Sequence, residues 1–162
     1  MSAVAASLIA VAGTLLGSFS TYWFQQKAAR RSEAGARQER LRQDRLTACS
    51  EFAAAVSGLR SSVIAVWFRK NRKGRQPADD EAVADYYTAY AEADRLGAVA
   101  ETAKFRMLLV IDDAELSGLA DAALRQVGAV MPARDKAEVE KLDAEFEAHM
   151  AVFVATAARL LS

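Results

Sequence analysis

The chain has 162 residues, of which 52% are apolar, and that length predicts one domain with or without an appendage. One cysteine and one histidine exclude a disulfide framework and a multi-histidine metal cage, and two prolines exclude collagen-like and proline-rich disordered chains. The zero net charge hides an asymmetry: residues 1–76 carry 13 basic and 4 acidic side chains, a net +9, and residues 77–162 carry 8 basic and 17 acidic ones, a net −9.

The first segment, residues 3–24, contains no charged side chain. A helix of that length rises about 33 Å, enough to cross roughly 30 Å of bilayer hydrocarbon. Two aromatic residues end the segment and three basic residues follow it, and we expect these five to anchor it at the interface: Tyr22, Trp23, Lys27, Arg30 and Arg31. A signal peptide would carry its positive charge before the apolar run, and a buried core helix is the other alternative. We predict a retained transmembrane helix in the cell (inner or plasma) membrane, with the N-terminus outside and the C-terminal domain cytoplasmic.

Small residues recur along this span at spacings of three and four: Ala6, Ala10, Gly13, Gly17 and Thr21. Gly13 and Gly17 form a GxxxG pattern, which lets two helices approach closely in lipid. We therefore expect Gly13, Gly17 and Thr21 to pack in a homo-oligomer, although glycine and alanine are also common in membrane helices that do not associate.

Residues 25–46 form a basic juxtamembrane helix or stalk, since residues 26–46 hold seven basic and three acidic side chains and few large apolar ones. Each Lys or Arg near an anionic leaflet contributes about 1 kcal/mol of attraction to membrane lipid. The basicity could also serve only to set the topology, or could contact nucleic acid.

Residues 47–162 are predicted to form an all-α, antiparallel helical bundle domain. Its first helix carries a seam with alternating steps of three and four: Cys49, Phe52, Val56, Leu59, Val63 and Val66. The seam is too short for a long coiled coil, so it indicates a helix that faces a bundle core. Cys49 is expected to be a small buried hydrophobe, with a reactive thiol as the alternative.

Five positive charges follow within seven residues, and these are the candidate contacts to phosphate or an anionic partner: Arg69, Lys70, Arg72, Lys73 and Arg75. Such a run could bind lipid headgroups, nucleic acid or protein, or could be a solvated turn.

The acidic residues 79–81 predict the start of the next helix, because negative charge is favourable at a helix N-terminus. Its apolar face is expected to include three tyrosines, as core or interface residues, and to continue further along: Val83, Tyr86, Tyr87, Tyr90, Leu96, Val99 and Ala103. Residues 105–111 could be a strand or a helix end, and we predict a helix because no other strand-like segment could pair with them.

Asp112 is predicted to cap the following helix in a capping box with Glu115, and that helix is expected to end at about Val130. The last helix is expected from about residue 134 to 160. One face of it carries five apolar residues and the only histidine: Val139, Leu142, Phe146, His149, Phe153 and Leu160.

His149 has one acidic neighbour on its face, Glu145, which does not match the Glu-x-x-His pattern of di-iron bundles. The sequence also lacks a glycine-rich phosphate loop, a nucleophile elbow and a zinc motif. We therefore expect no catalytic residue, no metal site, no cofactor and no enzymatic activity.

Four features follow one another along the chain: the uncharged span, the Arg- and Gln-rich stretch from Ala28 to Arg45, a Leu/Val/Phe helix, and the segment from Arg106 to Asp113. In that order they resemble the small KilB-type membrane proteins of mycelial actinobacteria, which are associated with conjugative plasmids and similar integrated elements. The resemblance implies a role in spreading transferred DNA within the mycelium, with toxicity when uncontrolled. It supplies no catalytic residue.

The leading hypothesis is a non-enzymatic single-pass membrane protein that acts as an oligomeric scaffold or assembly component and could aid the spread of conjugative DNA. Its expected partners are membrane lipid, further copies of itself and a protein of a membrane assembly. Two alternatives stay open: a membrane-tethered nucleic-acid-binding protein that uses the basic stretches, and a toxic permeabilising protein built from the span.

Overall fold

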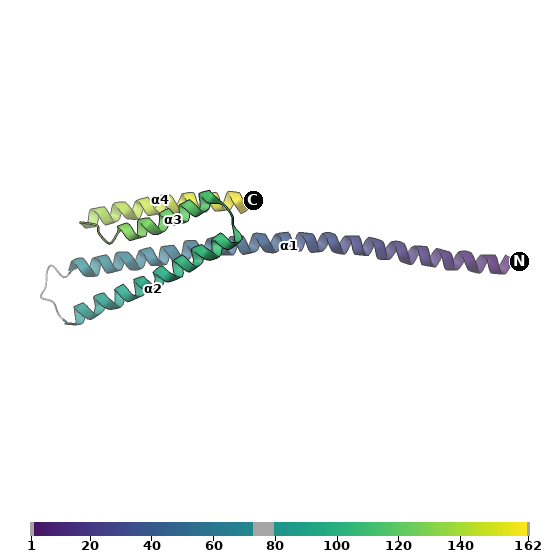
Figure 1. The fold of residues 1–162 in the computed structure, drawn as a ribbon, viewed down its shortest axis with the longest axis horizontal. Helices are drawn as coiled ribbons and strands as arrows, with labels where there is room; N and C mark the ends of the chain where they lie inside the picture. Colours follow the sequence, from purple (N-terminus) through teal and green to yellow (C-terminus); the bar gives the residue numbers. More distant parts are fainter. Residues whose placement is uncertain (1, 73–79, 162) are drawn as a thin grey trace. The chain divides into compact units, whose positions relative to one another are not determined.

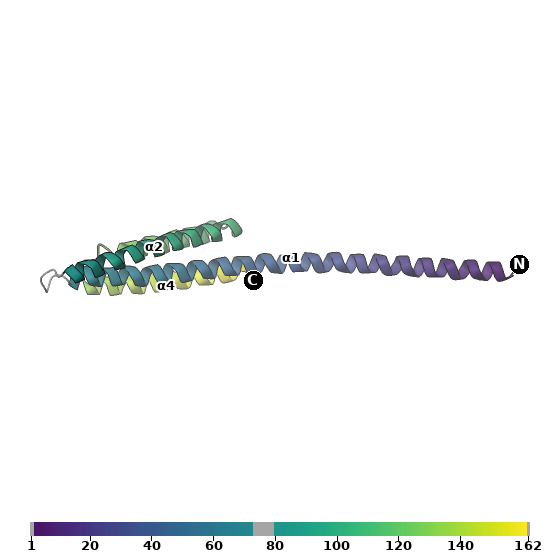
Figure 2. The ribbon, with the colours of Figure 1, turned by 90° about the horizontal axis from the view of Figure 1, so that it is seen from below.

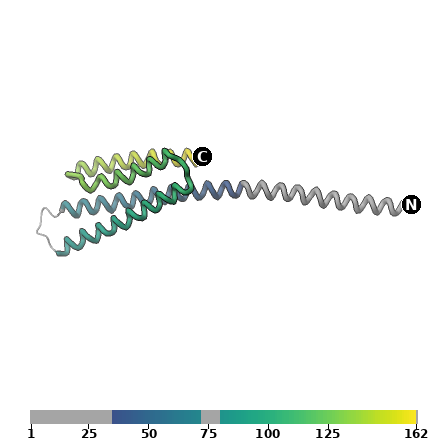
Figure 3. Tube along the Cα trace, viewed as in Figure 1, coloured from purple at the N-terminus to yellow at the C-terminus, as the bar shows by residue number. Residues whose placement is uncertain are grey.

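The computed structural model describes the backbone of residues 2–72 and 80–161, and the side chains of residues 35–71 and 80–161 (Figure 3). Its elements are the helices α1 (Ser2–Arg72), α2 (Asp80–Val110), α3 (Ala114–Ala129) and α4 (Lys136–Leu161) (Figure 1). No strand occurs within these ranges, so the all-α prediction is confirmed. The chain divides into two compact units, residues 1–41 and residues 42–162. The C-terminal unit contains the second part of α1 together with α2, α3 and α4.

One hydrophobic core, built from all four helices, holds the C-terminal unit together. The six seam residues of α1 are all buried, with at most 8% of each side chain exposed, which confirms the predicted seam. At its centre the rings of Phe52 on α1 and Phe153 on α4 lie 5.2 Å apart, centroid to centroid. At its end Trp67 donates a hydrogen bond from Nε1 to the carbonyl of Ala133, 2.9 Å away. Aromatic packing and this bond therefore tie α1 to the α4 side of the core.

Helices α3 and α4 lie beside each other (Figure 1). The buried residues of α3 recur at steps of three and four: Leu116, Ala120, Ala123 and Val127. Two of them are alanines, and small side chains let neighbouring helices approach closely. The buried residues of α4 are larger and include Phe146 and Phe153, both predicted as core residues. Their rings lie against Arg60 and Phe52 of α1, so α4 contributes large side chains and α3 smaller ones to one dense core.

Helix α2 is inclined to α1 in two perpendicular views (Figures 1 and 2). Its core-facing positions follow a heptad: Tyr86, Ala89, Ala93, Leu96, Ala100, Ala103 and Met107. Only the last three are buried. The first half of this seam is mostly alanine and can bury little apolar area. The predicted apolar face also included Tyr87, Tyr90 and Val99, with the tyrosines as core or interface residues. All three are exposed, so none of them is a core residue.

Two arginines of the predicted stalk bind the C-termini of other helices. Arg45 donates from Nε to the carbonyl oxygen of Val110, the last residue of α2, at 3.0 Å. Arg42 donates from Nε to the carbonyl oxygen of Leu161, the last residue of α4, at 2.9 Å. The terminal carbonyls of a helix lack intrahelical donors and carry partial negative charge, so a guanidinium is a favourable cap.

The residue that caps α3 is Asp113, so the prediction of Asp112 is wrong by one residue. Asp113 has the extended backbone of an N-cap residue, and its Oδ1 accepts a hydrogen bond from the amide of Leu116 at 2.7 Å. The amide of Ile111 is still bonded to the carbonyl of Met107 at 2.9 Å. Helix α2 ends at Val110, close to the predicted end, and the cap of α3 is the second aspartate of the adjacent pair.

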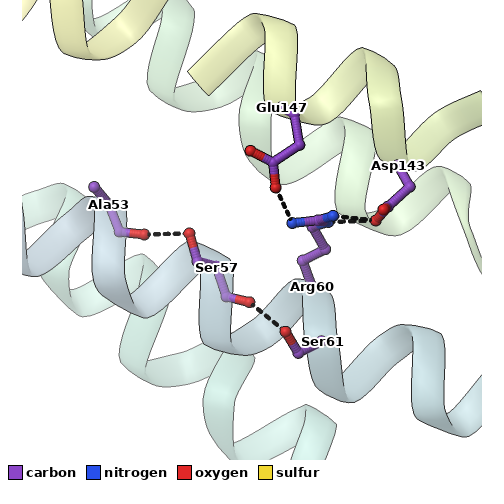
Figure 4. Close-up of polar contacts among 6 residues, drawn as sticks. All are labelled: Ala53, Ser57, Arg60, Ser61, Asp143 and Glu147. Atoms are coloured by element: carbon purple, nitrogen blue, oxygen red, sulfur yellow. Dashed lines mark hydrogen bonds and ion pairs between the residues drawn. The ribbon is translucent and has the colours of Figure 1, made fainter. Parts of the chain in front are cut away.

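Arg60 makes the main polar connection between α1 and α4 (Figure 4). Its guanidinium donates to Asp143 and Glu147, and its central carbon lies 4.9 Å from the ring centroid of Phe146. Beside it, Ser57 donates its hydroxyl to the carbonyl of Ala53 at 2.8 Å, within α1. Arg60 is 16% exposed, so its charge needs both carboxylates.

Replacing Asp113 with alanine should lower the free energy of unfolding by about 1 kcal/mol, because the amide of Leu116 loses its acceptor. Asp112→Ala is the matched control and should leave stability within about 0.5 kcal/mol of the wild type. Chemical denaturation followed by tryptophan fluorescence measures both. Equal losses for the two variants would contradict the assignment of the cap to Asp113.

Arg60→Ala should lower the free energy of unfolding by about 2 kcal/mol, since it leaves two carboxylates and the Phe146 ring without their shared partner. Arg106→Ala removes an exposed arginine whose ion pair with Glu51 is 3.7 Å long, and should change stability by less than about 0.5 kcal/mol. The same denaturation experiment compares them. A loss for Arg106→Ala as large as that for Arg60→Ala would refute a special role for the α1–α4 connection.

Candidate interaction surface

The most distinctive surface of the C-terminal unit is a stripe along α2, which we call the α2 outer face. Its members are all exposed and recur at steps of three, four and four: Tyr87, Tyr90, Asp94, Ala98, Glu101, Phe105 and Leu109. Large apolar or aromatic side chains occupy its ends, with exposed fractions of 65% for Tyr87, 51% for Tyr90, 57% for Phe105 and 85% for Leu109. Exposed apolar side chains concentrated on one helix face are typical of an interaction surface.

Helix geometry explains why these residues form one straight stripe. The three-four-four spacing repeats every eleven residues, or about 3.67 residues per turn, which stays close to the helical period along the whole helix. The core-facing seam repeats every seven residues, so its direction shifts around the helix relative to the α2 outer face. Helix α2 therefore carries two stripes of apolar side chains, one that faces the core and one that faces outward.

Two carboxylates occupy the middle of the α2 outer face. Neither Asp94 nor Glu101 has a hydrogen-bond or ion-pair partner among the residues that the structure describes. Neighbouring acids of α2 differ: Asp85 accepts from Arg69 at 2.9 Å, and Glu92 pairs with Arg95 at 2.7 Å. The hydrogen bond from Arg95 lowers the pKa of the Glu92 carboxyl below its ordinary value.

The tyrosines at the start of α2 form a cluster of rings. The centroid of Tyr86 lies 5.5 Å from that of Tyr87 and 6.3 Å from that of Tyr90. Tyr86 belongs to the core-facing seam and is half-buried, and its ring lies beside both exposed rings. The three tyrosines, predicted as core or interface residues, therefore have two locations. Tyr86 lies on the core side, and the other two lie on the outer face.

The predicted residues of the span and its interface lie outside the described side chains: Gly13, Gly17, Thr21, Tyr22, Trp23, Lys27, Arg30 and Arg31. Of the predicted basic run, Arg69 is bonded to Asp85 and Lys70 is exposed. Its other members, Arg72, Lys73 and Arg75, also fall outside the described side chains. Arg69 of this run is thus already paired within the C-terminal unit, where it connects the end of α1 to the start of α2.

Among the described residues, one helical stretch, Gly35–Asn71, is long and apolar enough to cross a membrane by length and composition. Within its most apolar window, 28% of the residues are buried inside the structure, and the stretch carries the seam of α1. Core helices of soluble domains meet the same criterion. We attribute the apolar character of this stretch to core packing, because Phe52 contacts α4 and Trp67 bonds to the loop between α3 and α4. The predicted span lies upstream of it.

His149 lies between α3 and α4, where its Nε2 is 2.8 Å from the carbonyl oxygen of Leu119. Within the described part of the chain, no group of three His, Cys, Asp or Glu side chains is placed to hold a metal ion. His149 therefore joins two helices through a hydrogen bond.

Cys49 lies on the buried seam and is 5% exposed, so the prediction of a small buried hydrophobe is confirmed. Burial raises the pKa of its thiol above the ordinary value, since the thiolate would lose its hydration. It borders a largely apolar groove of about 290 Å³ between α1 and α4.

Sequence reasoning named the tyrosines but missed Asp94, Glu101, Phe105 and Leu109 as members of the same surface. The signal that could have found them is the eleven-residue spacing, which links them to Tyr87 and Tyr90. Spacing alone does not say which of two apolar stripes faces the core.

Comparison with known families gives one result that covers most of the chain. The model of the KilB plasmid transfer protein family matches residues 46–161. The match begins two residues before Ala48, the first buried side chain among those that the structure describes, and spans the core helices. Searches of curated proteins and of solved structures gave no match.

The single thiol offers a test of the packing around the seam. Cys49 in the folded chain should react with a bulky disulfide reagent at pH 8 at least about ten times more slowly than in denaturant, because both burial and the raised pKa reduce the available thiolate. Absorbance of the released thiolate follows the reaction. Equal rates in both conditions would show that the seam is open around Cys49.

Proposed function

This chain belongs to the KilB plasmid transfer protein family, and we propose that it acts in plasmid transfer as a non-enzymatic, membrane-anchored assembly component. The observation that carries the proposal is the family match, which coincides with the helical unit from residue 46 to residue 161. The expected function therefore resides in this unit, and the segment before it serves to place the unit in the cell.

The non-enzymatic part of the proposal is supported by the way the unit uses its polar side chains. Asp113 caps a helix, Asp143 and Glu147 hold Arg60, and His149 bridges two helices. These side chains stabilise the fold through hydrogen bonds and ion pairs. The α2 outer face instead carries exposed aromatic, aliphatic and acidic groups, a chemistry suited to binding another macromolecule.

The membrane part of the proposal rests on the sequence of the first 46 residues. An uncharged segment at 3–24, followed by seven basic side chains within 26–46, is typical of a single span whose following domain is cytoplasmic. In this arrangement the helical unit forms an antiparallel bundle at the cytoplasmic side, and Tyr22 and Trp23 lie at the interface.

Self-association is the third part of the proposal. Gly13 and Gly17 would allow two spans to pack closely, and the anchor would then concentrate the helical units. The basic first half of one copy and the acidic second half of another would attract each other at low salt. Such an oligomer would present several α2 outer faces to a transfer apparatus and so aid the spread of plasmid DNA.

Removing the protein from donor cells should reduce plasmid spread, and the full chain should restore it, whereas a chain that starts at residue 25 should not, because it lacks the anchor. Transfer frequency between cells measures this, and a fluorescent protein fused after residue 162 reports whether the C-terminus is cytoplasmic. Normal spread without the protein, or a C-terminus outside, would contradict the proposal.

Native mass spectrometry in detergent tests the oligomer. We expect wild-type oligomers and monomers for the double variant Gly13→Ile/Gly17→Ile, because bulky side chains keep the spans apart. Ala6→Ile alters a small residue further from the motif and serves as the control. A wild type that is monomeric at low salt would refute self-association. Retention of DNA by the chain, if it depends on Arg69 and Lys70, would favour the nucleic-acid alternative. Leakage of lipid vesicles caused by the protein would favour a permeabilising role.

A further inference from the structure

We propose that the α2 outer face docks a cationic amphipathic helix of a second protein, an inference that rests on the proposed assembly role and names the class of partner. The face is about 33 Å long from Tyr87 to Leu109, the length of six helical turns. It presents aromatic rings at one end, Phe105 and Leu109 at the other, and two carboxylates between them.

Two carboxylates on this face indicate that the partner is positively charged. Asp94 and Glu101 are seven residues apart, or about 10 Å along the helix, and both are without a partner in the described part of the chain. A helix that lies along the face would meet them with two Lys or Arg side chains at the same two-turn spacing. Its apolar side chains, before and after the cations, would cover the two ends of the face.

A second copy of the same face does not fit. In a parallel pair each carboxylate meets its own equivalent. In an antiparallel pair that matches the apolar ends, Tyr87 lies opposite Leu109 and Tyr90 opposite Phe105, so Asp94 lies opposite Glu101. Both arrangements place like charges together, which disfavours the pairing.

Nucleic acid and an anionic membrane are disfavoured for the same reason. Both present negative phosphates, and the two carboxylates at the centre of the face would repel them. The cations nearest to the centre do not reverse this, because Arg95 is held by Glu92, Lys104 by Asp121 and Arg106 by Glu51. A cationic protein helix is the occupant that satisfies both the charge and the apolar ends.

The shape beside the face permits close approach. Ala98, at the centre of the face, also borders an open groove of about 750 Å³ between α1 and α2, whose floor includes Ala54 and Ala55. Because these side chains are small, a docked helix can lie near the α2 backbone between its two carboxylates. Val99 and Thr102 line the same groove and extend the contact toward α1. Its charged lining residues are Glu51, Arg95 and Arg106, of which Arg95 is bound to Glu92 and Arg106 is paired with Glu51.

Charge exchange between two designed peptides tests the proposal. Both peptides are amphipathic helices of about 22 residues with leucines near each end. The basic peptide carries lysines two turns apart, and the acidic peptide carries glutamates at the same positions. Fluorescence anisotropy with the full chain in detergent should show binding of the basic peptide at least about ten times tighter than that of the acidic one.

The double variant Asp94→Lys/Glu101→Lys should reverse this preference. Glu140→Lys/Glu145→Lys on α4 changes the net charge equally and is the matched control, which should keep the wild-type preference. Tyr87→Ala/Leu109→Ala should weaken binding of the basic peptide several-fold, since it removes apolar area at both ends. Circular dichroism checks that each variant keeps its helices.

Three results would overturn the proposal: a wild type that binds both peptides alike, a control that loses the basic peptide as fully as the α2 variant, and efficient disulfide pairing between copies that carry Ala98→Cys. Plasmid spread separates this inference from the proposed function. Charge reversal at Asp94 and Glu101 should reduce spread while the chain remains in the membrane and oligomeric, whereas a failure of the proposed function would leave spread unchanged even when the whole protein is removed.

Discussion

The apolar seam of α1 is the constraint on which the rest of the C-terminal unit depends. Phe52 packs its ring against Phe153, and the seam on either side gives the other helices a common surface to cover. Arg60, on a neighbouring face of α1, binds two carboxylates of α4 and so determines which side of α1 that helix takes. Apolar area supplies the driving force, and the ion pairs of the largely buried Arg60 supply the orientation of α4.

The position of α2 follows from the same core. Helix α4 packs large side chains such as Phe153 against the seam, α3 adds smaller ones, and α2 covers another side mainly with alanines. Helix α2 buries side chains only from Ala100 to Met107, and Ala93 and Leu96 before them are partly buried. Its remaining apolar side chains then stay on the surface, which is how the α2 outer face arises within an otherwise buried arrangement.

Arginines distribute the charge of the unit in a way that the net balance hides. Arg42 and Arg45 cap helix ends, Arg60 joins α1 to α4, and Arg69 holds the start of α2. Several of the chain's positive charges are therefore paired within the unit, whereas the carboxylates of Asp94 and Glu101 remain available at its surface. In the proposed assembly, the available charge, and not the net charge, selects the partner.

The sequence by itself determined the helical class, the α1 seam, the burial of Cys49 and the family resemblance, because a 3.6-residue period and a strong apolar contrast are local properties of a chain. It placed the cap of α3 one residue early, because two adjacent aspartates are equally good N-cap residues and only the backbone conformation distinguishes them. Only the packed structure shows how deeply each stripe of α2 is covered, with Ala100, Ala103 and Met107 buried and Tyr86 half-buried. The outer stripe carries Asp94 and Glu101, whose burial without partners would be costly, whereas the core-facing stripe carries no charge.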